Sequence, residues 1–151
     1  MFDFKFKDNT DKILQELERK ERKFAEQAGM FLETQAKKNI TEFTYQGKNH
    51  PGYVDTGRAR GSISHTYTVS DDEIVIYTGS NVSYFVWLEI GSGIYASDGK
   101  GRKSPWMYTD RNGETHWTSG IRPSHSLQRA ISDNVNTLNK SFIFKSAVFE
   151  V

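Results

Sequence analysis

Four histidines are the residues of this chain best suited to acid–base or metal chemistry: His50, His65, His116 and His125. No two of them stand four residues apart, the spacing at which two imidazoles on one helix face bind a metal, and no carboxylate accompanies them in a recognisable metal motif. The 151-residue chain has no cysteine, which excludes thiolate sites and cysteine nucleophiles. The sequence therefore predicts no metal, no cofactor and no catalytic residue. A hydrolase or nuclease built on His116 and nearby acids stays open as an alternative that the spacing does not support.

Two glycine-rich stretches invite comparison with phosphate-binding and nucleophile loops. The stretch 93–101 approaches a P-loop, but its glycine spacing is one residue too long, and Gly101 stands where Ser or Thr would hold magnesium. The stretch 91–93 places a serine between glycines without the extra residue on each side that a nucleophile elbow needs. Both are predicted to be mobile loops.

One basic run, Lys100, Arg102 and Lys103, comes directly before Trp106. Cations beside aromatic rings can bind phosphate and stack on bases. Three basic residues can contact only a few phosphates, however. The formal net charge is only +1, from 20 Lys and Arg against 19 Asp and Glu. Dedicated nucleic-acid binders carry a large basic excess. The run is predicted to be a solvated loop tip.

A long helix and several short elements must position these residues. Apolar residues at helical spacing predict one helix over residues 11–39, with Asn9 or Thr10 as its N-cap. Only Leu17 is apolar within 15–23, so this part is expected to be a solvated face or an oligomer contact.

Glycine at position 29 lowers the stability of a helix interior by about 1 kcal/mol relative to alanine. We expect it to serve a purpose there, either close packing of the helix on a sheet or a slight kink. Shorter helices are predicted over 54–63, capped by Asp55 or Thr56, and over 83–90, closed by Gly91. A last helix is predicted over about 124–139.

Two hairpins are predicted. In the first, residues 65–70 face 73–78, which sets Val69 opposite Ile74 and Tyr67 opposite Ile76 and gives one apolar face.

In the second hairpin, Asn112-Gly113 predicts a two-residue type I′ turn, which pairs Arg111 with Glu114 and stacks Tyr108 against Trp117. A register shifted by one would set Asp110 against Glu114, two like charges, so the first register is expected.

The architecture that these elements predict is α+β: a mainly antiparallel sheet with hairpins, packed by a long N-terminal helix and a C-terminal helix. Residues 1–7 alternate as a short edge strand or docking arm, and 141–151 alternate like a strand. A single domain over 1–151 is expected.

No stretch approaches 18 consecutive apolar residues, so we expect a soluble protein made without a secretion signal and no membrane partner.

Three blocks, in order, resemble the phage tail-completion, or head–tail joining, family: residues 54–63, residues 79–94 and residues 101–123. The first reads Val-Asp-Thr-Gly-Arg-x-Arg-x-Ser-Ile, the second contains Trp-Leu-Glu-Ile-Gly-Ser-Gly-Ile, and the third begins Gly-Arg-Lys-Ser-Pro-Trp-Met-Tyr. The long preceding helix is also of the family's kind. The chain departs from the family's pattern at Ala59, where a larger apolar residue is usual, and at 125–127, where a Pro-Phe-Leu-like step is usual.

This resemblance implies a structural virion protein rather than an enzyme. Such subunits join as a ring, often of six, at the head-proximal end of a long tail. The expected partners are other copies of the chain, the tail tube protein and the head-completion or connector protein, with DNA passing through the ring. The protein is expected at the tail–head junction of the virion, after synthesis in the host cytoplasm.

The resemblance also assigns candidate residues. The loop 95–104, with Lys100, Arg102 and Lys103, is expected to face a partner or the channel. Independently of the resemblance, Arg58 and Arg60 stand two residues apart and so do not share a helix face; one is expected to pair with Glu89 and the other to reach solvent or a neighbour. The candidate interface or motif residues are Arg58, Arg60, Tyr84, Trp87, Glu89, Trp106 and Trp117.

The alternative function is a carbohydrate- or nucleic-acid-binding module that uses Trp106, Tyr108 and Trp117 as a stacking surface. The charge distribution favours self-association instead. Residues 70–90 carry four acids and no Lys or Arg, whereas 91–125 carry five bases against three acids. Opposed patches on one subunit suit contact between copies better than capture of a polyanion.

Overall fold

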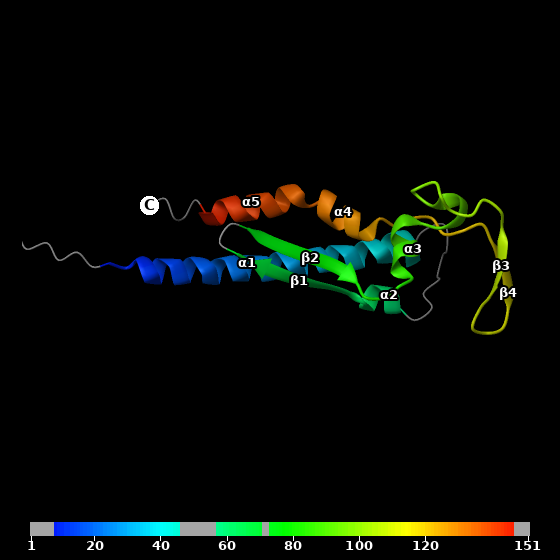
Figure 1. The fold of residues 1–151 in the computed structure, drawn as a ribbon, viewed down its shortest axis with the longest axis horizontal. Coiled ribbons are helices and arrows are strands. Elements are labelled where there is room, and N and C mark those ends of the chain that lie inside the picture. Colours follow the sequence, from blue (N-terminus) through cyan, green and yellow to red (C-terminus); the bar gives the residue numbers. More distant parts are fainter. Residues whose placement is uncertain (1–7, 46–56, 71–72, 147–151) are drawn as a thin grey trace, which may run out of the picture.

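The computed structural model describes residues 8–45, 57–70 and 73–146, the last six as backbone alone. A long helix, α1 (Thr10–Ile40), runs along the longest axis of the molecule (Figure 1). It packs on the hairpin of β1 (Ile63–Val69) and β2 (Ile74–Ser80) and also on α4 (Ser126–Ser132). The α+β class is confirmed, and the described strands form two separate two-stranded antiparallel sheets.

The predicted long helix is confirmed, and it continues as one π-helical segment over Thr41–Tyr45. The N-cap residue is Asn9, as predicted, but its side chain makes no capping hydrogen bond. Asp8, one residue earlier, supplies the acceptor: its Oδ1 accepts hydrogen bonds from the backbone N–H and the hydroxyl of Thr10, at 2.9 and 2.6 Å. A carboxylate is the better partner because it also interacts favourably with the positive end of the helix dipole. The two bonds from Thr10 hold the pKa of Asp8 below its usual value.

The two halves of α1 have different environments. Buried positions begin at Ala25 and recur through Leu32 and Ile40, whereas Ile13 and Leu14 in the first half are 58% and 57% exposed. The first turns of α1 extend beyond the β1–β2 hairpin (Figure 1). This half therefore has an apolar face that no described part of the chain covers.

The core lies around the second half of α1, where the ends of several elements meet. It combines helix α2 (Arg58–Gly61), the start of β1, helix α3 (Phe85–Ile90) and α4. The buried cluster consists of Ala36, Ile40, Ala59, Ile63, Phe85 and Ala130. Three of the six are alanines, which lets the helix backbones approach closely. The two predicted short helices are confirmed, although α2 begins after Gly57, and the proposed caps at positions 55 and 56 lie outside the described residues.

The first hairpin has the predicted register, with Tyr67 opposite Ile76 and Val69 opposite Ile74. Its inner face rests on α1 at Gly29. A Cβ built there would stand only 2.3 Å from Cδ2 of His65, closer than real Cβ contacts ever come. Of the two roles predicted for this glycine, close packing on the strand is therefore the one observed.

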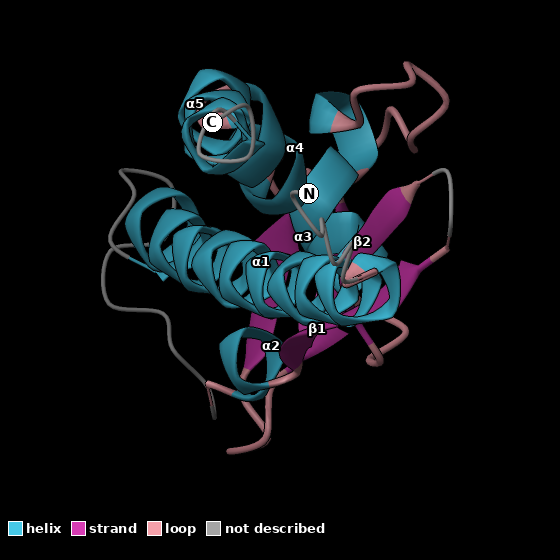
Figure 2. Cartoon of the chain, turned by 90° about the vertical axis from the view of Figure 1, so that its left-hand side faces the viewer, coloured by secondary structure: helices cyan, strands magenta, loops and turns pink. Residues whose placement is uncertain are grey.

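The C-terminal region differs from the prediction. The predicted last helix is two helices, α4 and α5 (Val135–Ser146), which run alongside α1 (Figures 1 and 2). They separate at Asn134, whose side-chain Nδ2 donates to the carbonyl of Ala130 at 3.0 Å, while its backbone N–H donates to Ile131 instead. The side chain thus occupies the acceptor that a continuous helix would use.

The strand predicted over 141–151 is wrong for residues 141–146, which end α5, while 147–151 lie outside the described residues. No glycine or proline follows Pro123 to stop the helix. A short apolar run such as 142–144 does not by itself distinguish strand from helix.

Candidate functional site

A second hairpin projects from one end of the molecule, across its long axis (Figure 1). It consists of β3 (Trp106–Thr109) and β4 (Thr115–Thr118), and we call residues 98–118 the arm. Its most exposed large hydrophobic side chain is Trp117, at 70%, followed by Met107 on the opposite strand. Pro105 and Trp117 line a shallow open hollow together with Thr118 and Ser119. The arm thus presents apolar surface that the described body of the chain does not cover.

The register predicted for the arm is wrong by one residue. Met107 faces Trp117 and Tyr108 faces His116, whereas the prediction set Tyr108 against Trp117. The loop has three residues, 111–113, and Gly113 adopts φ 84°, a left-handed conformation that glycine tolerates best.

The carboxylate of Asp110 explains this register. Its Oδ1 accepts the backbone N–H groups of Asn112 and Glu114, both at 2.9 Å, and its Oδ2 lies 3.0 Å from Nε2 of His116. These bonds lower the pKa of Asp110, with the bond from His116 as the largest cause. They offset the repulsion that was expected to exclude this register, because they stabilise the ionised carboxylate that faces Glu114.

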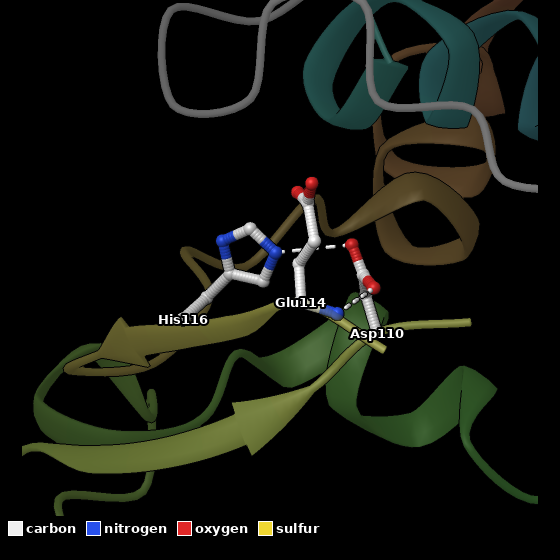
Figure 3. A group of neighbouring side chains, drawn as sticks. All are labelled: Asp110, Glu114 and His116. Atoms are coloured by element: carbon white, nitrogen blue, oxygen red, sulfur yellow. Dashed lines mark hydrogen bonds and ion pairs between the residues drawn. The ribbon is translucent and has the colours of Figure 1, made fainter. Parts of the chain in front are cut away.

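The same register brings three potential metal ligands together. Figure 3 shows Asp110, Glu114 and His116 around the tip of the arm, and one ligand atom from each lies within 4.8 Å of the other two. Sequence reasoning missed this group because the other register separates Asp110 from Glu114. The available signal was an aspartate directly before the turn, a position at which Asp commonly binds the backbone of the following residues.

The glycine-rich stretch 91–93 lies at the base of the arm. Ser92 N–H donates to the carbonyl of Ile121 at 2.8 Å, and Ile94 N–H donates to that of Ser119 at 3.0 Å. Gly93 and Gly120 both have positive φ, and a Cβ on either would lie 2.0 Å from a backbone oxygen of the other segment. This stretch, predicted to be a mobile loop, is a close backbone crossing that joins the arm to the body.

The three basic candidates all lie on the exposed loop that leads into β3. Lys103 Nζ donates to the carbonyl of Gly99 at 2.9 Å. The guanidinium of Arg102 donates to Ser104 at 3.1 Å and lies 5.6 Å from the centre of the Trp106 ring. Lys100 is exposed beside Asp98, which accepts its backbone N–H. All three residues are exposed, and the charged groups of Arg102 and Lys103 bind within the loop itself.

The expected pairing of an α2 arginine with Glu89 is not observed for Arg60. Its guanidinium donates to the hydroxyl of Thr41 at 3.2 Å and lies 5.7 Å from the centre of the Tyr45 ring. Burial raises the pKa of the Tyr45 hydroxyl, which accepts the backbone N–H of Arg60 at 3.3 Å. Arg58 lies exposed on the same helix.

The carboxylate of Glu89 is hydrogen-bonded to the first residues of α4. It accepts the hydroxyl of Ser126 at 2.7 Å and the backbone N–H groups of Leu127 and Gln128 at 3.0 and 3.1 Å. It therefore caps that helix from α3. Trp87, on α3, and Tyr84, the residue before α3, are both exposed.

The candidate residues from the sequence thus do not form one site. They lie in three places: on α2, around α3, and on the arm with its basic loop (Figure 1). None of the described helices has the length and apolar character that a membrane span requires.

A comparison with protein families assigns the chain. Residues 4–91, more than half of its length, match the family described as "Bacteriophage HK97-gp10, putative tail-component". The chain belongs to this family of phage tail components. The predicted resemblance to a tail family is therefore confirmed. No curated protein and no solved structure matches the chain.

As a tail component, the protein is part of the virion. The family match covers α1, the β1–β2 hairpin and α3, and it ends at Gly91, where the backbone crosses toward the arm. Arg58, Arg60, Tyr84, Trp87 and Glu89 lie within the matched residues. The arm of this tail component, with Trp106, Trp117 and the basic loop, lies beyond them.

Proposed function

We propose that this tail component is a ring-forming subunit that completes the head-proximal end of the tail and joins it to the head. Its partners are further copies of the chain, the tail tube protein and the head-completion or connector protein, and DNA passes through the ring. The protein acts as a structural component and not as an enzyme. The observation that carries this proposal is membership of the tail-component family over residues 4–91.

Two uncovered apolar surfaces on the chain support assembly. The first, on the first half of α1, consists of Ile13, Leu14 and Leu17, and the second, on the arm, consists of Met107 and Trp117. They lie toward opposite ends of the long axis (Figure 1). A closed ring needs two different patches that meet head to tail, so we propose that the arm surface of one copy contacts the α1 surface of the next.

Two single variants test this contact. Leu14→Glu places a charge on the α1 surface and leaves the arm intact, whereas Trp117→Glu does the reverse. Each variant alone is expected to remain monomeric when mixed with tail tubes, because every contact then contains one altered surface. An equimolar mixture retains one intact contact, between the arm of Leu14→Glu and the α1 surface of Trp117→Glu, and is expected to form dimers that do not extend.

Size measurement in solution and electron microscopy of protein mixed with tail tubes are the readouts. Wild-type protein is expected to form rings or to cap tube ends, and Tyr77→Ala, which changes an exposed aromatic residue on the body, is the matched control. If wild type neither forms rings nor binds tubes, the assembly role is wrong. If the mixture stays monomeric while wild type assembles, the assembly role stands and the proposed pair of surfaces is wrong.

A further inference from the structure

We propose that the tip of the arm, formed by Asp110, Glu114 and His116, binds a divalent transition-metal ion of the Zn²⁺ class. The site does not rest on the proposed ring, since all three residues belong to one hairpin of one copy.

The donor atoms suit such an ion. One imidazole nitrogen and two carboxylate oxygens form a mixed set, and imidazole favours Zn²⁺ and its transition-metal neighbours over Mg²⁺ and Ca²⁺, which prefer oxygen alone. Three protein ligands leave at least one position for water or for a group from another molecule. The tip is open to solvent, with Glu114 exposed and His116 partly so, and an ion can therefore enter without any rearrangement of the body.

Hydrogen bonds and ring packing within the arm hold two of the three ligands near their positions before any ion binds. Asp110 is fixed by the N–H groups of Asn112 and Glu114, and it draws Nε2 of His116 to 3.0 Å. The ring of His116 also lies 5.4 Å, centre to centre, from the ring of Tyr108 on the opposite strand. Less side-chain freedom is consequently lost on binding than in three unconnected residues.

Only a small adjustment separates this arrangement from coordination. Bonds of 2.0–2.2 Å to a tetrahedral ion place ligand atoms about 3.3 Å apart, and the three atoms already lie within 4.8 Å of one another. Glu114 can supply the movement because its side chain is long and exposed, and Figure 3 shows its carboxylate directed away from the strands. His116 would present the lone pair of a neutral ring nitrogen to the ion in place of its bond to Asp110.

The charges at the tip also favour a cation. The observed register sets the carboxylates of Asp110 and Glu114 on facing positions, and like charges on facing positions destabilise a hairpin. A bound divalent ion would neutralise both carboxylates and stabilise the same register, so binding and the folding of the arm tip are coupled.

The test is calorimetric titration of the full chain, without a histidine tag and freed of metal by a chelator, with ZnCl₂, together with visible absorption spectroscopy of the Co²⁺ complex. We expect one ion per chain. His116→Gln and Glu114→Gln are each expected to weaken binding about tenfold or more. Glu73→Gln, which changes an exposed acid next to the turn of the first hairpin, is the matched control and is expected to bind like wild type.

Thermal unfolding without metal checks that each variant is folded, and Asp110 is left unchanged because it also holds the loop. The proposal is overturned if wild type shows no saturable Zn²⁺ binding below about 1 mM, or if both variants bind like wild type. MgCl₂ that binds as tightly as ZnCl₂ would also overturn it, because the imidazole would then have no role. These outcomes involve neither rings nor tail tubes, and they leave the proposed function untouched.

Discussion

Oε2 of Glu89 accepts a hydrogen bond from the hydroxyl of Ser126 at 2.7 Å, which joins the end of α3 to the first residue of α4. The same carboxylate accepts the backbone N–H groups of Leu127 and Gln128. The backbone at Glu89 contributes as well, since its carbonyl accepts the N–H of His125 at 3.1 Å. The N-cap residue of α4 is His125, which has φ 48° and whose side chain makes no capping hydrogen bond. The carboxylate of Glu89 supplies the cap in its place.

Replacing Glu89 by alanine is therefore expected to lower the free energy of unfolding by about 1–3 kcal/mol, because three donors at the start of α4 lose their acceptor. Glu89→Gln should cost less, since the amide oxygen still accepts but carries no charge. Urea unfolding measures both effects, and Glu73→Ala on the first hairpin is the control. Equal midpoints for wild type and Glu89→Ala would contradict the capping role.

The elements that the sequence predicted correctly are those whose determinants are local. The periodicity of 11–39 is enough for α1, and the cross-strand apolar pairs that begin with Val69 and Ile74 select the register of the first hairpin. The role of Glu89 was not predictable in this way, because its partners lie 37 to 39 residues further along the chain. The expected partner was an arginine, chosen by charge alone.

Two of the errors, the register of the arm and the continuous last helix, have a common physical cause in side chains that bind backbone groups. Asp110 accepts two N–H groups and reverses the expected register of the arm, and Asn134 takes a carbonyl and divides the last helix. Arguments from charge pairs and periodicity compare side chains only with one another, so they omit this competition. The group of Asp110, Glu114 and His116 was missed for the same reason.

Substitution of Gly29 by alanine tests the close contact of α1 with β1. Alanine has the higher helix propensity, by about 1 kcal/mol, but its Cβ would overlap the ring of His65. We expect a net loss of about 1–3 kcal/mol, the usual cost of overpacking. In a His65→Ala background the overlap disappears, and the same Gly29→Ala change should become neutral or stabilising. Thermal unfolding of the four proteins measures this coupling, and additive effects would show that Gly29 and His65 do not compete for space.

Acid is expected to weaken the packing of β1 on α1 through Glu33. The carboxylate bonds to Lys37 and to Nδ1 of His65, and these bonds, Lys37 first, lower the pKa of Glu33. His65 also faces Glu26, with Nε2 at 3.8 Å from its carboxylate. A depressed pKa contributes stability above the unfolded value of about 4.3, and this contribution is lost as the pH falls through the folded value.

Glu33→Gln should remove this contribution of about 1 kcal/mol, so the stability of the variant should fall less steeply than that of wild type between pH 5 and 3, a window set by the unfolded pKa of about 4.3. Urea midpoints at several pH values give the comparison. Glu18→Gln, on the exposed side of the same helix and paired with Arg22, is the matched control. Parallel curves for wild type and Glu33→Gln would show that Glu33 does not link folding to pH in this range.

The register of the arm depends on Asp110. In Asp110→Ala the backbone N–H groups of Asn112 and Glu114 lose their acceptor, and the two-residue Asn112-Gly113 turn with its Arg111–Glu114 pair becomes competitive. In Asp110→Asn the side-chain oxygen still accepts both N–H groups, so the observed register should persist. Cross-strand nuclear Overhauser contacts distinguish the two: Met107 faces Trp117 in the observed register, and Tyr108 would face Trp117 in the other. Alanine and asparagine variants that both keep the contact of Met107 with Trp117 would show that the strands, and not the Asp110 carboxylate, select the register.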